Sequence, residues 1–392
     1  MKKFLFGIIT LSLLVFISSC QKEDEVAKQD ITVFADDIIP GQYVVVLKPS
    51  TNKAFTQLKY VEKVQVVKQE ATQMGVDESS IQQAYGSAIR GFAAKLNDEQ
   101  LAMLKNDDKV AYIVPDKMYS LGRGPGGGGG GTVDPPEPVA QVIPYGIIRV
   151  GYGDGTGKTA WIIDTGVDLD HPDLNVDAAS GYDFINNDAY GDDDNGHGSH
   201  CAGTVAAIDD DFGVVGVAAN ATIVPVKVLD RRGSGAYSVI IAGVDFVAAN
   251  ASPGDAANMS LGGGVYEPID DAVINLANAG IFVALAAGNE SDDANNHSPA
   301  RANAANIWTI SAMDENDYFA SFSNYGNPPI EFCMPGVYVF STFKDGGYET
   351  YSGTSMAAPH MCGVLLMTGG NPSTDGYVNG DPDGNPDPIA HL

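Results

Sequence analysis

A break in composition at residues 121–139 constrains the fold of this chain more than any other feature. The segment contains six consecutive glycines, Gly126 to Gly131, and then three prolines between Pro135 and Pro138. Glycine loses much backbone entropy on ordering and adds no side chain to a core, so the segment cannot hold a packed element. We therefore expect a linker between a small domain at residues 40–120 and a large one at residues 140–392.

The N-terminus has the pattern of an export signal. Two lysines precede an apolar stretch from Phe4 to Ile17, which is too short to span a membrane stably. Residues 17–20, Ile-Ser-Ser-Cys, resemble a bacterial lipobox, which predicts a signal peptide over 1–19 and a lipid anchor on Cys20. The alternative is plain secretion with an incidental cysteine.

Residues 20–39 would link this anchor to the first domain. Their acidic run, Lys22 to Glu25, resembles surface-export tags of some Gram-negative lipoproteins, although a solvated linker explains it equally well. The prediction is an exported protein, made as an outer-membrane or cell-surface lipoprotein precursor.

The charge balance excludes nucleic acid as a partner. The chain carries 50 acidic and 22 basic residues, a formal net charge of −28, which repels phosphate backbones and favours cation binding. Beyond Cys20 there are only Cys201, Cys333 and Cys362, too few for a disulfide framework. These three are expected to be core residues, with a Cys201–Cys362 bridge as the alternative.

Residues 40–120 predict a small α+β domain. Their hydrophobic patterns indicate strands and helices in alternation. The expected strands are Gln42–Lys48, Gly91–Leu96 and Val110–Val114, and the expected helices are Asn52–Glu70 and Asp98–Lys105.

The large domain predicts a mostly parallel sheet. Short apolar strands alternate with helical stretches, as in α/β proteins whose ligands lie at the carboxyl ends of the strands. The expected strands are Thr159–Ile163, Thr222–Leu229, Ala256–Leu261, Ile281–Ala286 and Asn306–Ser311.

Three residues in the large domain together suit acyl transfer. Asp164 follows an apolar strand, His197 lies between glycines before a helix, and Ser355 lies where a small-residue turn enters a helix. A serine nucleophile, a histidine base and a carboxylate that orients the base form a catalytic triad. A metal site at His197 and His200 is the weaker alternative, because no third ligand has motif spacing. The acidic residues 192–194 and Asp188 are expected to form a solvated loop.

These three segments resemble the signature motifs of the subtilase family, in the order Asp, His, Ser. The similarity runs from about Ala140 to Gly363 and implies a subtilisin-like three-layer α/β fold with a mostly parallel sheet. Residues 40–48 and 91–96 resemble the family's propeptide, which implies a ferredoxin-like α+β domain that blocks the active site as an intramolecular inhibitor.

The resemblance also implies the rest of the site. Asn289, in Ala-Ala-Gly-Asn-Glu, would supply the oxyanion hole beside the Ser355 N–H. Two segments would bind the substrate backbone as strand-like edges, namely Gly233, Ser234 and Gly235 on one side and Ser260, Leu261 and Gly262 on the other.

A structural Ca²⁺ is the cofactor that the resemblance implies. Its six oxygen ligands would come from Gln141, Asp173, Asp210 and the carbonyls of Ile208, Phe212 and Val214. Such an oxygen-only set suits Ca²⁺. A solvated acidic loop is the alternative.

The sequence as a whole predicts a secreted or lipid-anchored serine endopeptidase that acts on peptides or proteins as a monomer and is made as a self-processing zymogen. Cleavage between about Tyr119 and Ala140 would leave the lipid on the propeptide and free the catalytic domain. The alternative is a surface binding module that keeps this fold without catalysis.

Overall fold

The structure is a computed structural model that describes residues 37–122 and 140–392. The predicted signal peptide, Cys20 and most of the predicted linker therefore lie outside the described residues. None of the helices in the described ranges is long and apolar enough to cross a membrane.

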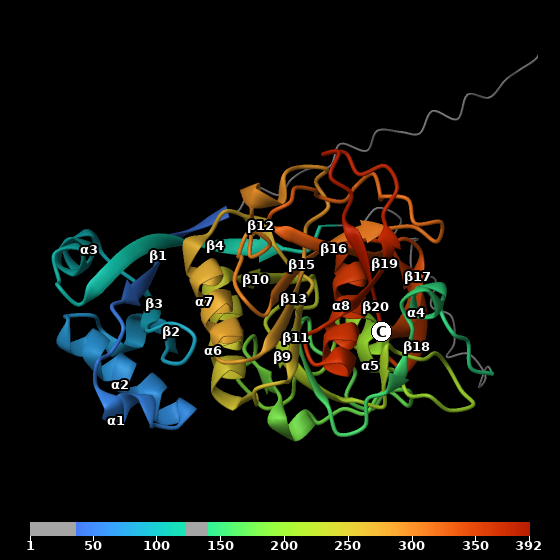
Figure 1. The fold of residues 1–392 in the computed structure, drawn as a ribbon. Coiled ribbons are helices and arrows are strands. Elements are labelled where there is room, and N and C mark those ends of the chain that lie inside the picture. Colours follow the sequence, from blue (N-terminus) through green and yellow to red (C-terminus); the bar gives the residue numbers. More distant parts are fainter. Residues whose placement is uncertain (1–36, 123–139) are drawn as a thin grey trace, which may run out of the picture. The chain divides into compact units, whose positions relative to one another are not determined.

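The first domain is an antiparallel sheet in the order β4-β1-β3-β2, covered by helices on one face (Figure 1). This order, with two helical crossovers, is the predicted ferredoxin-like arrangement. The elements are β1 (Asp37–Leu47), α1 (Lys53–Thr56), α2 (Tyr60–Gln73), β2 (Ile81–Tyr85), β3 (Gly91–Lys95), α3 (Asp98–Lys105) and β4 (Val110–Ser120).

The range Asn52–Glu70 is largely helical, as predicted, but it is divided between the two helices α1 and α2. Asn52 caps α1 by accepting from the Ala54 N–H at 3.0 Å. A new helix then begins after Lys59, whose own N–H donates to Glu62 at 2.9 Å. The strand β2 was also missed, since its sequence IQQAY does not alternate in hydropathy.

Alternation of side chains along β1 gives the first domain two apolar faces. Val45 and Leu47 pack with α2 and α3 in the domain's own core. Val44 and Val46 instead belong to a cluster with Tyr237 and Ile241 of the second domain. The sheet of the first domain is therefore buried on both sides.

The second domain has a nine-stranded sheet in the order β19-β20-β16-β15-β13-β11-β6-β9-β7. All neighbouring strands are parallel except β19 and β20, which confirms the predicted fold class. The strands are β6 (Thr159–Asp164), β7 (Tyr182–Asp183), β9 (Thr222–Lys227), β11 (Ala256–Met259), β13 (Phe282–Ala286), β15 (Ile307–Met313), β16 (Ile330–Pro335), β19 (Ser373–Tyr377) and β20 (Pro388–His391).

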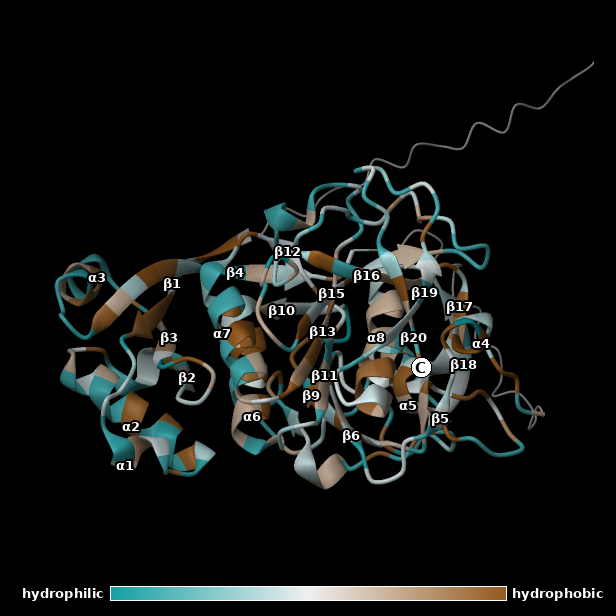
Figure 2. Cartoon of the chain, in the orientation of Figure 1, coloured by the Kyte–Doolittle hydropathy of each residue, from teal (hydrophilic) through white to brown (hydrophobic). Residues whose placement is uncertain are grey.

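Helices cover both faces of this sheet, and apolar residues line its strands (Figure 2). The cluster on one face includes residues of α5 and α8, and the cluster on the other includes residues of α6 and α7. The helices are α4 (Tyr145–Val150), α5 (His197–Ala206), α6 (Tyr237–Asn250), α7 (Glu267–Asn278) and α8 (Thr354–Thr368).

Short two-stranded pairs complete the second domain. These are β5 (Gly153–Asp154) with β8 (Ala218–Ala219), β12 (Gly263–Gly264) with β14 (His297–Ser298), and β17 (Val339–Phe343) with β18 (Gly347–Tyr351). One further strand of the second domain, β10 (Ser234–Ala236), lies outside the nine-stranded sheet and pairs with β4 of the first domain.

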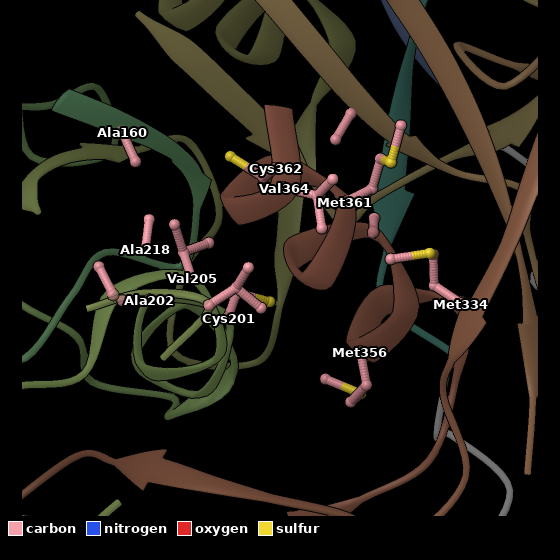
Figure 3. Packing of buried hydrophobic residues seen from close by; sticks show 14 of the residues in the cluster. Ala160, Cys201, Ala202, Val205, Ala218, Met334, Met356, Met361, Cys362 and Val364 are labelled. Atoms are coloured by element: carbon pink, nitrogen blue, oxygen red, sulfur yellow. The ribbon is translucent and has the colours of Figure 1, made fainter. Parts of the chain in front are cut away.

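The contact between α5 and α8 is made by small and sulfur-containing side chains. Figure 3 shows Cys201 and Val205 of α5 beside Met356 and Cys362 of α8. Cys201, Cys333 and Cys362 are all buried and free, so the alternative of a Cys201–Cys362 bridge is wrong. The helices that carry His197 and Ser355 are thus fixed to each other through an apolar core.

Candidate active site

Asp164 and His197 meet at the carboxyl end of β6. Asp164 is the last residue of this strand and is fully buried, while His197 is the first residue of α5. His197 Nδ1 lies 2.8 Å from Asp164 Oδ1, and the Thr165 N–H donates to the same oxygen at 2.7 Å. The carboxylate is thereby oriented toward the imidazole.

The Asp164 carboxylate makes His197 a stronger base. Burial lowers the pKa of His197, but the charge of Asp164 and the hydrogen bond to it raise this pKa, and the net shift is upward. The charge of Asp193 adds to the rise. An imidazolium at this position is thus stabilised by two carboxylates.

Ser355 lies in the first turn of α8, half-buried and close to the same strand end. The Cys201 sulfur lies 3.5 Å from the Ser355 carbonyl oxygen and 4.0 Å from Asp164 Oδ2. The Ser355 hydroxyl donates to the Ser260 carbonyl at 3.2 Å. Within the described residues no hydrogen bond joins Ser355 to His197, and catalytic hydrogen bonds of this kind often form only when substrate binds.

His200 does not join His197 in a metal site. Its Nε2 lies 3.0 Å from the Val339 carbonyl, and its complete burial lowers its pKa to about 3. Its imidazole is therefore neutral and engaged in the core.

Asn289 is held against the residue that precedes Ser355. The Asn289 Oδ1 atom accepts from the Thr354 N–H at 2.8 Å and from the Thr354 hydroxyl at 3.1 Å. This fixes which end of the amide faces Thr354 and turns the amide nitrogen away from it.

The two predicted substrate-binding segments lie in different surroundings. The Ser260 hydroxyl donates to the Ser355 carbonyl at 2.7 Å, and Leu261 is buried. On the other segment, Gly233 has a φ of +72°, and a Cβ there would meet the Leu121 side chain at 2.8 Å. Glycine is therefore needed at position 233 for the close approach of the first domain.

The end of β4 pairs in antiparallel register with the predicted substrate-binding segment at residues 233–235. Ser120, Tyr119 and Met118 face Ser234, Gly235 and Ala236, and the Leu121 N–H donates to the Gly233 carbonyl at 2.8 Å. The Tyr119 side chain is buried, and its ring centroid lies 6.3 Å from that of Tyr237. The first domain thus occupies one of the two predicted substrate edges.

Buried carboxylates tie the two domains together. Asp245 of α6 accepts from the N–H groups of Gly86, Ser87 and Ala88 at 2.9, 2.7 and 2.6 Å. Asp116 of β4 accepts from the Ser238 N–H at 3.1 Å. Sequence reasoning missed both, because their donors in the other domain lie more than 100 residues away.

Four of the predicted calcium ligands, Gln141, Asp173, Ile208 and Val214, contact one another, and one carboxylate oxygen among them is buried without a hydrogen bond. Asp173 is fully buried, and its Oδ1 has no hydrogen-bond partner. Burial and nearby Asp210 raise the pKa of Asp173 to about 7, although its hydrogen bonds oppose this. The Gln141 Nε2 atom donates to the Ile208 carbonyl at 3.0 Å and to the Val214 carbonyl at 3.5 Å, and the Phe212 N–H donates to Asp210.

The prediction of a solvated loop is wrong for one residue. Asp188, Asp192 and Asp194 are exposed, but Asp193 is only 6% exposed and accepts hydrogen bonds from the start of α5. An Asp shortly before a helix is a capping signal, which could have identified it.

The comparisons with known proteins agree with this geometry. Residues 155–374 match the model of the subtilase family, Peptidase S8. The chain belongs to the subtilase family. Residues 42–122 match the model of the peptidase inhibitor I9 family.

Relatives match most of the chain. It is 39% identical over 351 residues to alkaline serine exoprotease A of Vibrio alginolyticus, covering 85% of this chain and 61% of that protein. It is 34% identical over 378 residues to the extracellular serine proteinase of Thermus sp. (strain Rt41A), covering 92% of this chain and 89% of the relative. A crystal structure of a cold-adapted subtilisin-like serine proteinase matches with a TM-score of 0.53 and 41% identity, over 57% of this chain and 84% of that one.

The family, the relatives and the fold make this chain a subtilisin-like serine endopeptidase. The I9 domain makes it a zymogen whose inhibitor is part of the same chain.

Proposed function

We propose that Asp164, His197 and Ser355 are the catalytic triad of this subtilase. The observation that carries the proposal is the 2.8 Å contact between Asp164 and His197 beside the start of α8. In the reaction, the Ser355 hydroxyl turns from the Ser260 carbonyl to His197 Nε2 and attacks the substrate carbonyl. His197 takes the proton and returns it to the leaving amine, and water then hydrolyses the acyl-enzyme.

Asn289 is the oxyanion donor in this proposal. Thr354 holds its Oδ1 atom, so its amide N–H groups and the Ser355 N–H can both face the substrate oxygen. The positive end of α8 favours the same negative charge.

Substrates bind as extended strands between residues 233–235 and 260–262. The support is the antiparallel pairing of β4 with β10, because a peptide substrate would form the same main-chain bonds. The inhibitor domain therefore blocks the site by occupying a substrate edge. The processing bond in this proposal lies between about Tyr119 and Ala140, so that cleavage separates the inhibitor domain from the catalytic domain 140–392.

A Ser355→Ala variant tests the proposed nucleophile. It should neither cleave casein nor process its own precursor, with turnover reduced by about 10⁶-fold. Ser321→Ala, which removes an exposed hydroxyl away from the triad, serves as the control. A wild-type precursor that cleaves neither casein nor itself would favour the alternative of a binding module.

Calcium fits the site around Asp173, where we propose a structural ion. The unpaired buried Oδ1 of Asp173, the Asp210 carboxylate, and the Ile208 and Val214 carbonyls that both face the Gln141 amide are oxygen ligands of the kind Ca²⁺ prefers. Gln141 and the Phe212 carbonyl would complete the set. The ion would brace the loop 208–214 against the start of the catalytic domain.

Chelation tests this site through stability. An ion at a hundredfold excess over its Kd stabilises the folded state by about 2.7 kcal/mol, so EDTA should lower the Tm of the wild-type protein. Asp173→Asn should abolish the effect of EDTA on the Tm. Asp209→Asn removes an exposed carboxylate from the loop 208–214 that is not a proposed ligand, so this variant should keep the effect. An unchanged Tm in EDTA would rule the ion out.

Lipid attachment at Cys20 is proposed from the sequence, with cleavage of residues 1–19 and a spacer over 20–39. The first form of the protein would then be membrane-bound, and processing would release a monomeric protease from the cell. Cys20→Ala should move the unprocessed Ser355→Ala precursor from the membrane fraction to the soluble one. Mass spectrometry of a mature enzyme that still began at Cys20 would contradict release by processing.

A further inference from the structure

Asp193 is a buried carboxylate that the triad mechanism does not use. It lies four residues before His197, is 6% exposed, and accepts five hydrogen bonds. It has exposed acidic neighbours on both sides, so its burial is specific to this position.

Three of the five donors are backbone N–H groups at the start of α5. They belong to Asn195, Gly196 and Ser199, at 3.0, 2.9 and 2.9 Å, and the Ser199 hydroxyl donates as well at 2.6 Å. The first N–H groups of a helix have no partner within the helix. The N-cap residue Gly196 offers no side chain for them, so Asp193 takes over part of this role.

The fifth donor connects Asp193 to β6. The Thr165 hydroxyl donates to Asp193 at 2.9 Å and accepts from the Gly198 N–H at 2.9 Å. The Thr165 N–H donates to Asp164, and the buried ammonium of Lys227 donates to the Thr165 carbonyl. Thr165 is therefore held from three sides, directly next to Asp164.

We propose that Asp193 is a positioning residue that sets the orientation of His197 against Asp164 by joining the end of β6 to the first turn of α5. Asp164 and His197 are 33 residues apart in sequence, and their 2.8 Å contact depends on how these two elements meet. Asp193 contacts both elements through a single carboxylate. The inference rests on the proposed triad.

The charge of Asp193 adds an electrostatic effect on the imidazole. All five of its partners are donors, so its oxygens accept as a carboxylate would, although burial raises the pKa of Asp193 itself. Its charge, after that of Asp164, raises the pKa of His197. The other charged or titratable groups around this region are Lys227 paired with Asp194, Lys344 on the β17–β18 turn, and the side chains of His200, Cys201 and Tyr351.

Asp193→Asn tests the proposal in the processed enzyme. Hydrolysis of succinyl-Ala-Ala-Pro-Phe-p-nitroanilide should show kcat lowered by roughly 10- to 100-fold, with KM little changed. The acidic limb of the kcat profile should also move to lower pH, because the imidazolium of His197 loses a stabilising charge. Asp192→Asn, which removes an exposed charge next to it, is the matched control and should change neither.

Two outcomes would overturn the proposal. One is that Asp193→Asn has the wild-type kcat and the wild-type acidic limb of its kcat–pH profile. The other is that Asp193→Asn and Asp192→Asn change these properties equally. Thr165→Val keeps the charge and removes the link to β6, so it should lower kcat without moving the limb. If Asp193→Asn does not fold, a wild-type kcat in Thr165→Val overturns the proposal instead. Failure of the triad itself is distinguishable, because Ser355→Ala would then remain active.

Discussion

Two buried carboxylates accept hydrogen bonds from backbone N–H groups, Asp193 before α5 and Asp245 on α6, but their donors come from different parts of the chain. Those of Asp193 lie within six residues of it, apart from Thr165, and all belong to the catalytic domain. Those of Asp245 lie 157 to 159 residues away, in the inhibitor domain.

This difference separates a permanent contact from a removable one. The bonds of Asp193 persist in the mature enzyme and contribute to its stability and its active-site geometry. The bonds of Asp245 contribute to the affinity of the inhibitor, and they are lost when the inhibitor leaves. Changes in the first region should therefore alter turnover, and changes in the second should alter release.

The largest effect is expected at the triad. Asp164→Asn should lower kcat by about 10⁴-fold, because the neutral amide no longer fixes the tautomer of His197 or stabilises the imidazolium. Precursor processing and hydrolysis of the p-nitroanilide peptide should fall in the same proportion. If gel filtration after processing showed that this variant also holds its inhibitor domain more weakly, the conclusion that the two regions control turnover and release separately would be wrong.

Loss of the proposed oxyanion donor should come next. Asn289→Leu should lower kcat by about 10²- to 10³-fold with little change in KM, because the donor acts mainly on charge that develops in the transition state. Steady-state kinetics on the processed enzyme measure both values. A large rise in KM with an unchanged kcat would place Asn289 in substrate binding instead.

The proposed triad could be predicted from the sequence because each proposed member lies in a local motif. Asp164 ends an apolar strand, and His197 and Ser355 each lie in the first turn of a helix whose N-cap is a glycine, so a few residues indicate the position of each. The parallel sheet could be predicted for the same reason, since its strands are short apolar runs. Four strands of this sheet, β7, β16, β19 and β20, were not predicted; for β19 and β20 the reason is that residues 373–391 are rich in Asp, Gly and Pro.

The burial of these carboxylates is harder to predict, because it depends in part on distant partners. Asp193 lies shortly before a helix, which is a capping signal, but nothing local separates it from Asp192 and Asp194 as the residue that contacts Thr165, 28 residues away. Asp245 lies in an apolar helix, where nothing local indicates that the inhibitor domain covers it.

Asp245→Ala should have an intermediate effect, confined to release. Three N–H groups of the inhibitor would lose a charged acceptor at a cost of about 3 kcal/mol, equivalent to about 10²-fold faster dissociation. Gel filtration at intervals after processing measures the release, and kcat of the freed enzyme should stay at the wild-type value. Asp271→Asn, whose half-buried carboxylate accepts from Tyr112 at 2.5 Å, should have a smaller effect.

The smallest effect is a pH dependence of inhibitor binding. Burial raises the pKa of Asp245 to about 6, and the N–H donors of the inhibitor oppose this only in part. After release the face of α6 is exposed, and this pKa returns toward about 4. A carboxyl with a higher pKa in the complex takes up a proton on binding, so affinity is greatest below pH 4 and falls as the pH rises through 6.

The inhibitor should therefore bind about tenfold more tightly at pH 5 than at pH 7.5. Burial also raises the pKa of Asp116, which acts in the same direction. Gel filtration of the processed complex at each pH separates this effect from the pH dependence of turnover. Asp245→Asn should reduce the dependence, since an amide does not titrate. Tighter binding at pH 7.5 than at pH 5 would contradict the linkage, and would mean that the three N–H donors outweigh the cost of burying the charge.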